Sequence, residues 1–172
     1  MKKTKIVIDA DVIIHFYKAD ALSILHKIFP DYDYVILSII LDEEIHGAAL
    51  DSIKNHILLL KNIKIEKWNP SGEMLREYAL LLKKYGTGES ACMAYCKFNH
   101  DIVASSNLKD IREYCEVNAI IYLTTMDFLY EAFKKSILTE DACNQFIATV
   151  IAKGSKLPNL KITEHQSRGL CL

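Results

Sequence analysis

Asp9 is the residue whose position in the sequence points most directly to chemistry. It follows the apolar run Ile6–Ile8 and precedes a second apolar run, Val12–Ile14. A carboxylate is costly to remove from water without a partner, so this position is unfavourable for stability. Ligand sites of open α/β sheets lie at the carboxyl ends of strands, so the same position suits binding or catalysis. Capping of a following helix explains an Asp here, but not why both flanking segments are so apolar.

A second carboxylate, Glu44, shares a helical face with apolar residues. Counting in helical steps from Ile40, the residues Leu41, Glu44, Ile45 and Ala48 fall on one stripe. We therefore expect the Glu44 side chain to point inward. Taken alone, Glu44 is also explained by an ion pair with a lysine.

Two more carboxylates recur in the same way further along the chain. Glu89 opens a helical pattern in phase with Cys92, and Asp110 shares a face with Asn107 and Ile111. Singly, Glu89 is explained by complementing a helix dipole, and Asp110 by a solvated helix surface. Four carboxylates aimed at one crevice predict a divalent-metal site, because hard cations take oxygen ligands.

Composition indicates one folded domain and gives no global nucleic-acid footprint. The chain has 172 residues, of which 51% are hydrophobic and three are Pro, with a net charge of −1. This excludes a disordered chain, and no apolar stretch approaches the length of about 20 residues that spans a membrane. Five cysteines without framework spacing favour a reducing cytoplasm over secretion. A polyanionic substrate would have to be held by local cations or by metal.

The chain alternates short apolar strands with longer helical patterns, which predicts an α/β fold with a parallel sheet covered on both faces. The predicted strands are Lys5–Ile8, Tyr34–Leu37, Ile63–Trp68, Ile102–Ala104 and Ile120–Leu123. The predicted helices are Val12–Ile28, Ile39–Leu60, Gly72–Lys84, Gly88–Asn99, Leu108–Val117, Met126–Ser136 and Glu140–Lys153. We assign residues 1–153 to the domain and residues 154–172 to a C-terminal tail that wraps the surface.

These segments resemble the ordered motifs of the PIN-domain nuclease family. The segments Ile6–Ile13 (IVIDADVI), Ser38–Ile45 (SIILDEEI) and Gly86–Ala94 (GTGESACMA) are similar to its first three motifs. The segment Ile102–Arg112 resembles the fourth motif, and Tyr122–Leu129 the segment that follows it. The resemblance covers about residues 5–150 and depends on the order of the motifs rather than on any single one.

The resemblance implies a three-layer α/β/α domain with a five-stranded parallel sheet in the order 3-2-1-4-5. It also implies cleavage of single-stranded RNA that depends on Mg²⁺ or Mn²⁺ held by three or four carboxylates. Asp9, Glu44 and Glu89 match the first three acidic positions. The fourth motif departs from the family, since many members have Asp where this chain has Ser106 and Asn107. Asn107 would then coordinate metal by its carbonyl oxygen, and Asp110, one turn on, would restore the charge.

Five further residues receive supporting roles in this interpretation. Thr87 and Ser106 would bond water or phosphate, and Lys109 and Arg112 would grip the substrate backbone. A solvated helix face explains both cations equally well. Asp11 would flank the pocket or cap the helix rather than bind metal directly.

Partners and alternative functions remain open from the sequence. Many members of the family are toxins held by small antitoxins, and many form homodimers, so the resemblance implies RNA, an antitoxin and a second copy as partners. The departure in the fourth motif leaves room for an inactive module that binds RNA or protein. The segment Asp9–Val12 also resembles the opening motif of haloacid-dehalogenase-type phosphatases, with Asp9 as nucleophile, but no downstream acidic pair is evident.

Two other patterns are interpreted as structural. Cys92 and Cys96 lie four residues apart with His100 one turn later, which suits zinc, but they fall on an apolar stripe and are predicted to pack in the core. Thr124 and Asp127 have the spacing of a capping box at a helix start.

Overall fold

The computed structural model describes residues 3–166 and has a five-stranded, all-parallel sheet in the order β3-β2-β1-β4-β5. The strands are β1 (Lys5–Ile8), β2 (Asp33–Leu37), β3 (Lys64–Glu66), β4 (Ile102–Ala104) and β5 (Tyr122–Leu123). This confirms the predicted fold class and strand order. Strands β3 and β5, at the two edges of the sheet, are shorter than the apolar runs that predicted them.

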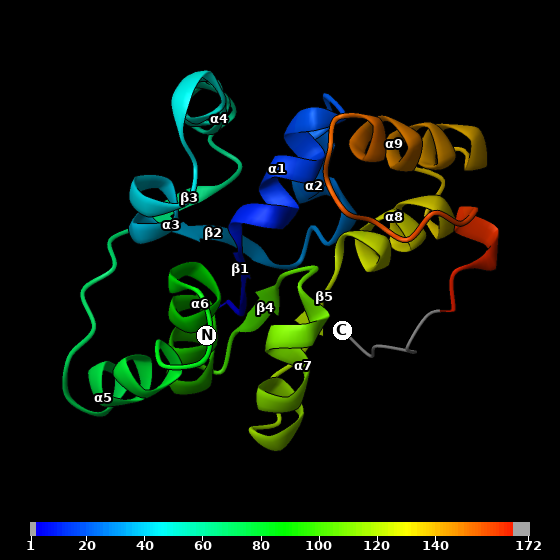
Figure 1. Cartoon of the computed structure of the whole chain (residues 1–172). Helices are drawn as coiled ribbons and strands as arrows, with labels where there is room; N and C mark the ends of the chain where they lie inside the picture. The colour runs from blue at the N-terminus through cyan, green and yellow to red at the C-terminus, as the bar shows by residue number, and fades with distance from the viewer. Residues whose placement is uncertain (1–2, 167–172) are drawn as a thin grey trace.

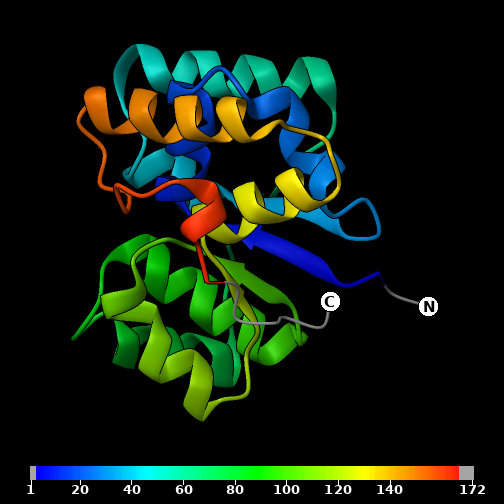
Figure 2. The same cartoon turned by 90° about the vertical axis from the view of Figure 1, so that its right-hand side faces the viewer.

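Helices cover both faces of the sheet (Figure 1). They are α1 (Ala10–Lys18), α2 (Leu22–Ile28), α3 (Ser38–Glu43), α4 (Gly47–Leu60), α5 (Gly72–Leu81), α6 (Thr87–Asn99), α7 (Leu108–Val117), α8 (Thr125–Lys134), α9 (Glu140–Ala152) and the 3₁₀ turn η1 (Ile162–Glu164). Figure 2 shows the layers edge-on, with α5, α6 and α7 on one side of the sheet and α1, α2, α8 and α9 on the other.

The central strand β1 explains the apolar run that precedes Asp9. Ile6, Val7 and Ile8 are all fully buried, because β1 lies between β2 and β4 with helices on both faces. On one of these faces an aromatic cluster fills the space between helices. The ring of Phe16 in α1 packs edge-on against Phe128 in α8, with centroids 6.0 Å apart.

Two helices that the sequence predicts as continuous are broken in the structure. The predicted helix Val12–Ile28 divides into α1 and α2 at Asp20, which has a φ of 55°. Asp is one of the residues that tolerate this left-handed region. The predicted helix Ile39–Leu60 divides into α3 and α4 at Gly47, whose φ is 64° and which reaches that region without steric cost. The expected inward face is therefore wrong beyond the break, and Ala48 is exposed.

The C-terminal tail runs from α9 back over α8 in its described part, residues 154–166 (Figure 1). Ile162 of η1 is fully buried, and its N–H donates to Asn144 Oδ1 at 2.9 Å. Residues 167–172 of the predicted tail, which include Cys171, lie outside the described residues. Across residues 3–166, each helix is too short or too polar to cross a membrane.

Candidate metal centre

Asp9 directly follows β1 and is the N-cap of α1. Its backbone N–H donates to Ala104 O at 2.9 Å, which continues the pairing of β1 with β4. Its side chain is turned inward, because the residue is only 2% exposed, and Oδ1 accepts the Ala10 N–H at 2.8 Å. The end of the central strand thus fixes one buried carboxylate at the C-terminal edge of the sheet.

The charges within residues 3–166 that act most strongly on Asp9 come from other carboxylates. Burial raises the pKa of Asp9 well above its usual range, and Asp11, Glu89 and Glu44 raise it further, while the bond from Ala10 acts in the opposite direction. The structure therefore brings Asp9, Glu44 and Glu89, predicted from separate segments, into one acidic group.

Glu44 follows the last residue of α3 and reaches across to the start of α6. Its Oε1 accepts the N–H of Gly88 at 2.5 Å. A Cβ atom at Gly88 would lie 2.6 Å from Glu44 Cδ, so only glycine lets this carboxylate approach the helix so closely. Burial raises the pKa of Glu44, and Glu89 and Glu43 add to the rise, although the Gly88 bond lowers it.

Asn107 links Glu89 to Asp110. Asn107 is the N-cap of α7, and its Nδ2 donates to Glu89 Oε1 at 3.0 Å and to Asp110 Oδ2 at 2.7 Å. The amide nitrogen, rather than the predicted carbonyl oxygen, therefore faces the carboxylates. Asp110 joins the acidic group through Asn107.

Asp11 joins the start of α1 to the loop after β4. One carboxylate oxygen accepts the Val12 N–H at 2.6 Å, and the other accepts the Ser106 N–H at 2.7 Å and lies 3.5 Å from Ser105 Oγ. Burial raises the pKa of Asp11 to about 6, even though the bonds from Ser106 and Val12 lower it. Asp11 flanks the acidic group and holds the loop that carries Asn107.

The four residues predicted to contact substrate occupy different surroundings. Thr87 is the first residue of α6, two positions before Glu89. The Ser106 hydroxyl is engaged with α8, since it donates to Thr125 Oγ1 at 2.8 Å and accepts the Thr125 N–H at 2.9 Å.

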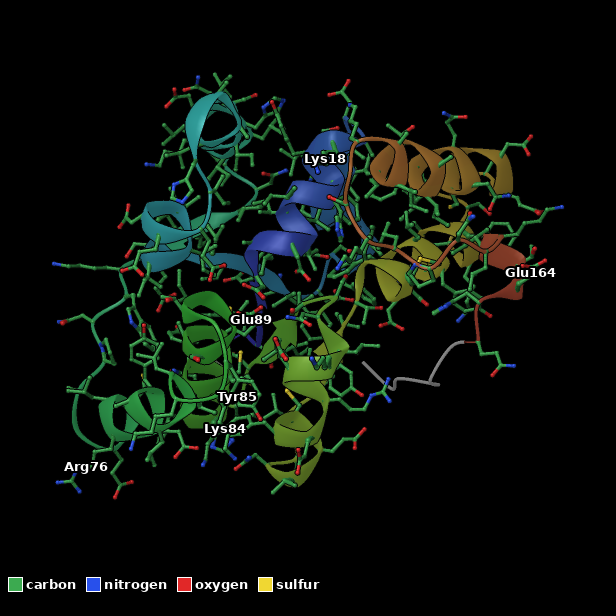
Figure 3. The ribbon with its side chains drawn as sticks, viewed as in Figure 1. Lys18, Arg76, Lys84, Tyr85, Glu89 and Glu164 are labelled. Carbon is green, nitrogen blue, oxygen red and sulfur yellow. The ribbon has the colours of Figure 1, made fainter. Side chains whose placement is uncertain are left out.

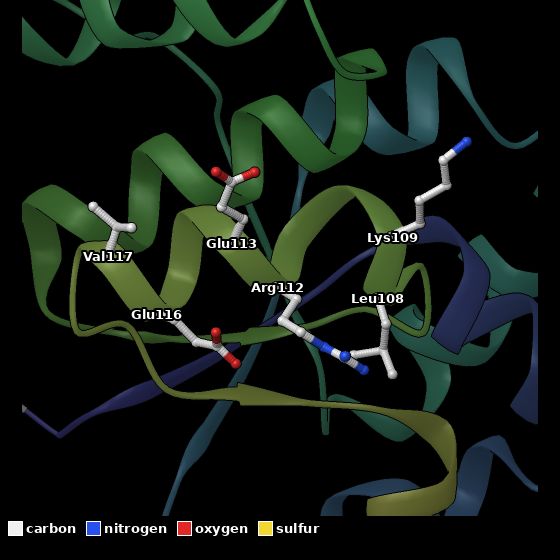
Figure 4. A pocket seen from close by; sticks show the side chains of 6 residues that line it. All are labelled: Leu108, Lys109, Arg112, Glu113, Glu116 and Val117. Atoms are coloured by element: carbon white, nitrogen blue, oxygen red, sulfur yellow. The ribbon is translucent and has the colours of Figure 1, made fainter.

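Lys109 and Arg112, the two predicted cations, lie on the exposed face of α7. Both line a groove of about 410 Å³ that also carries Glu113 and Glu116. Figure 4 shows the side chains of Lys109 and Arg112 pointing in different directions from the helix. Only Lys109 also lines the cavity beside the acidic group. The structure therefore brings Lys109, but not Arg112, to that cavity.

A cavity of about 720 Å³ opens beside the acidic group. Its lining includes Asp11, Ile14, His15, Lys18, Glu89, Ser106, Asn107, Leu108, Lys109, Ser155 and Lys156. The predicted site had no place for His15, Lys18, Ser155 or Lys156. Part of the signal was present, because residues 11, 15 and 18 follow helical spacing and form a polar stripe on an otherwise apolar helix. The approach of Ser155 and Lys156 depends on the tail and has no local signature.

The group of side chains fits a hard divalent cation by its chemistry. The acidic group consists of carboxylates and the amide of Asn107, whose oxygens can serve as metal ligands. Its negative charge is uncompensated, which suits Mg²⁺ or Mn²⁺. Across residues 3–166, however, no three His, Cys, Asp or Glu side chains are gathered closely enough to hold a metal ion as they stand. Glu44 is turned to Gly88 and Glu89 to Asn107. Carboxylates that repel one another are expected to take such neutral partners.

The patterns interpreted as structural are confirmed. Cys92, Cys96 and Cys115 form no disulfide within residues 3–166, have no exposed surface and belong to the core. Burial raises the pKa of the Cys92 thiol, and the charge of Asp9 raises it further, so Cys92 lies beneath the acidic group as an inert packing residue. Thr124 and Asp127 form the predicted capping box at the start of α8.

No protein-family model and no curated protein sequence matches this chain.

Proposed function

We propose that this protein is a PIN-type nuclease that cleaves single-stranded RNA with the help of Mg²⁺ or Mn²⁺. One observation carries the proposal: the buried carboxylate of Asp9 directly follows the central strand, and the negative charges of Asp11, Glu89 and Glu44 act on it. A folded chain gains nothing in stability from such an arrangement. An oxygen-rich acidic group at the C-terminal edge of a parallel sheet is, however, suited to binding a hard cation.

Asp9, Glu44 and Glu89 would hold the cation, with Asn107 and Asp110 beside them. When bound, the cation would orient the phosphodiester, lower the pKa of the attacking water and neutralise charge on the leaving oxygen. The chain itself supplies position. Asp9 is fixed by the sheet and by the Ala10 N–H.

Asp11 acts as a positioning residue in this scheme. Its two carboxylate oxygens are tied to α1 and to the loop after β4, so it fixes how that loop meets the first turn of the helix. The same loop places Asn107 against Glu89. The fourth motif thus contacts the acidic group through Asn107, although it lacks the usual Asp.

The proposal includes a cytoplasmic location and a homodimer, and it extends to the toxin of a toxin–antitoxin pair. The described cysteines form no disulfide and are all buried, which suits a reducing compartment. Leu58, Leu59 and Leu60 at the end of α4 are 64%, 81% and 44% exposed, and Ile65 on the edge strand β3 is 43% exposed. Exposed apolar side chains of this kind suit contact with a second copy. Light scattering that shows a monomer at high concentration would refute the dimer, and a small gene directly upstream would support the toxin role.

The direct test is cleavage of single-stranded RNA by the wild type and by Asp9→Asn, with Mg²⁺ or Mn²⁺ and with chelator. We expect cleavage that needs the metal, and a loss of at least about 100-fold in Asp9→Asn, equivalent to about 2.7 kcal/mol in the barrier. Glu43→Gln is the matched control, because Glu43 is exposed beside Glu44, and it should cleave like the wild type.

The two alternatives predict different results in the same assay. A wild type that cleaves no nucleic acid but hydrolyses a small phosphomonoester through an aspartyl-phosphate on Asp9 would be a phosphatase. A wild type that is inactive and whose unfolding temperature does not respond to Mn²⁺ would be an inactive binding module. Either result would overturn the proposed nuclease.

A further inference from the structure

The cavity beside the acidic group has cationic walls that come from three distant segments. Lys18 ends α1, Lys109 is in the first turn of α7, and Lys156 belongs to the segment that follows α9. His15, which also lines the cavity, is buried and neutral at pH 7, because burial lowers its pKa to about 4. Among residues 3–166, the three lysines therefore supply the positive charge of this cavity, opposite the carboxylates of Asp11 and Glu89.

Lys18 holds the tail segment in place. Its Nζ donates to Lys153 O at 2.8 Å and to Ser155 Oγ at 2.7 Å, and Lys153 Nζ donates in return to Lys18 O at 2.5 Å. Figure 3 shows Lys18 beside the segment that leaves α9, and Glu89 at the end of α6 nearest the start of α1. The tail is thus fastened to α1 at the point where it forms one wall of the cavity.

Lys109 and Lys156 differ from Lys18 because their ammonium groups have no partner within residues 3–166. Both are exposed, and neither has an ion pair or hydrogen bond of its side chain within residues 3–166. By contrast, Lys97 on the neighbouring helix α6 is paired with Glu77 at 2.9 Å. Two free ammonium groups that line one cavity from different segments suit the phosphates of a nucleic-acid backbone.

The position of the tail relative to the acidic group indicates which phosphates of a bound nucleic-acid strand the cavity would hold. Asp11 lies in the first turn of α1 and Lys18 is its last residue, seven positions further on, which is about 10 Å along the helix axis. The tail is fastened at the far end of this interval. A strand with its scissile phosphate at the carboxylates would therefore place a neighbouring part of its backbone in the cavity.

We propose that Lys109 and Lys156 bind the backbone of the single-stranded RNA from two sides of this cavity, next to the phosphate that is cleaved. The identity of the strand as a substrate rests on the proposed function, whereas the binding itself does not. The segment after α9 then has a role that its sequence does not reveal. It forms a wall of the substrate cavity, and Lys18 fixes that wall.

The test is the salt dependence of binding of a short, labelled single-stranded RNA by the full chain, measured by fluorescence anisotropy in chelator so that no cleavage occurs. Each lysine that contacts a phosphate contributes about 0.7 to the slope of log K against log salt concentration. We expect Lys109→Gln and Lys156→Gln each to reduce the slope by about 0.7, and the double variant by about 1.4. Lys161→Gln is the matched control, because Lys161 is exposed on the same tail and does not line the cavity.

The outcomes separate this inference from the proposed function. If the wild type cleaves RNA but the two lysine variants keep the wild-type slope and cleave with unchanged KM, the lysine proposal is wrong and the nuclease proposal stands. If the slopes of the lysine variants fall as expected but the wild type never cleaves RNA, the lysine proposal stands and the nuclease proposal fails. Equal effects of Lys161→Gln and Lys156→Gln would show non-specific charge attraction and would overturn the lysine proposal.

Discussion

Charged side chains lie at both ends of the central strand β1, and the two groups are built differently. At its first residue, Lys5 Nζ contacts Glu66 Oε2 and the Tyr95 hydroxyl, each at 2.6 Å, and Tyr95 also donates to Glu66. Burial alone would lower the pKa of Lys5, but the bonds with Glu66 and Tyr95 raise it above its usual range. Directly after the last residue of β1, the charges within residues 3–166 that act most strongly on Asp9 are those of further carboxylates, Asp11, Glu89 and Glu44.

The difference separates a group that holds the fold together from one that is suited to a ligand. The Lys5 group has opposite charges and a shared hydroxyl donor, so the charge that is buried is also compensated. The Asp9 group buries charge of one sign, and the pKa values of Asp9 and Glu44 are raised as a result. Perturbed carboxylates at a cleft are the usual sign of a functional site, and a bound cation would supply the missing compensation.

Without metal, the largest effect on stability that we predict at this edge of the sheet is a pH dependence due to His15. Its pKa is about 4 in the folded chain and about 6.5 when unfolded, so between these values the unfolded state binds more protons. Stability contributed by neutral His15 is therefore complete above pH 6.5 and is lost as the pH falls towards 4. The wild type should lose on the order of 2 kcal/mol more than His15→Gln between pH 7 and pH 4.5.

Urea unfolding at several pH values measures this difference, and subtracting the variant from the wild type removes the contribution of the carboxylates. A His15→Gln variant with the same pH dependence as the wild type would contradict a neutral, buried His15.

A substitution at Gly88 should affect the acidic group without weakening the fold. In Gly88→Ala, the new Cβ would meet the Glu44 carboxylate, which would swing away and lose its N–H partner. We expect cleavage to fall about tenfold, equivalent to about 1.4 kcal/mol. Alanine favours a helix over glycine by about 1 kcal/mol. This gain should offset the lost hydrogen bond to Glu44, so the free energy of unfolding should change little. In a double-mutant cycle, Glu44→Gln should add little to Gly88→Ala, and fully additive losses would show that Gly88 acts by another route.

The Lys5 group should show the opposite behaviour. Glu66→Gln removes the negative charge that faces Lys5, so we expect a loss of about 1 kcal/mol in the free energy of unfolding. This estimate is reduced from that of a fully buried pair because the Glu66 side chain is 36% exposed. RNA cleavage per folded molecule should be unchanged. A cleavage defect as large as that of Asp9→Asn would erase the distinction between the two ends of β1.

The sequence was sufficient to predict the sheet and its strand order, but not where the helices break. The buried strands are continuous apolar runs, which makes them visible, and the resemblance to the PIN family supplied their order. The apolar phase continues across Asp20 and resumes after Gly47, so periodicity alone could not show that the chain turns there. Both breaks are set by single residues with positive φ.

The acidic residues were predictable because each follows a strand or lies at the end of an amphipathic helix. Their hydrogen bonds were not, since the bond from Gly88 to Glu44 and the bond from Asn107 to Glu89 join segments that are far apart in sequence. Lys156 is the clearest omission. It approaches the site only because the tail is fastened to α1, and no local pattern encodes that contact.

Unfolding of the wild type and of Asp9→Asn, with and without Mn²⁺, tests most directly whether the acidic group is a metal centre. Asn caps a helix as well as Asp does, so the variant should keep the fold. Without metal it should be more stable by on the order of 1 kcal/mol, because one buried carboxylate that its neighbours repel is gone. At Mn²⁺ concentrations about 100 times the Kd, the wild type should gain about 2.7 kcal/mol, and the variant should gain far less. Equal gains in both proteins, or a metal-free variant less stable than the wild type, would contradict the assignment of Asp9 to a metal centre.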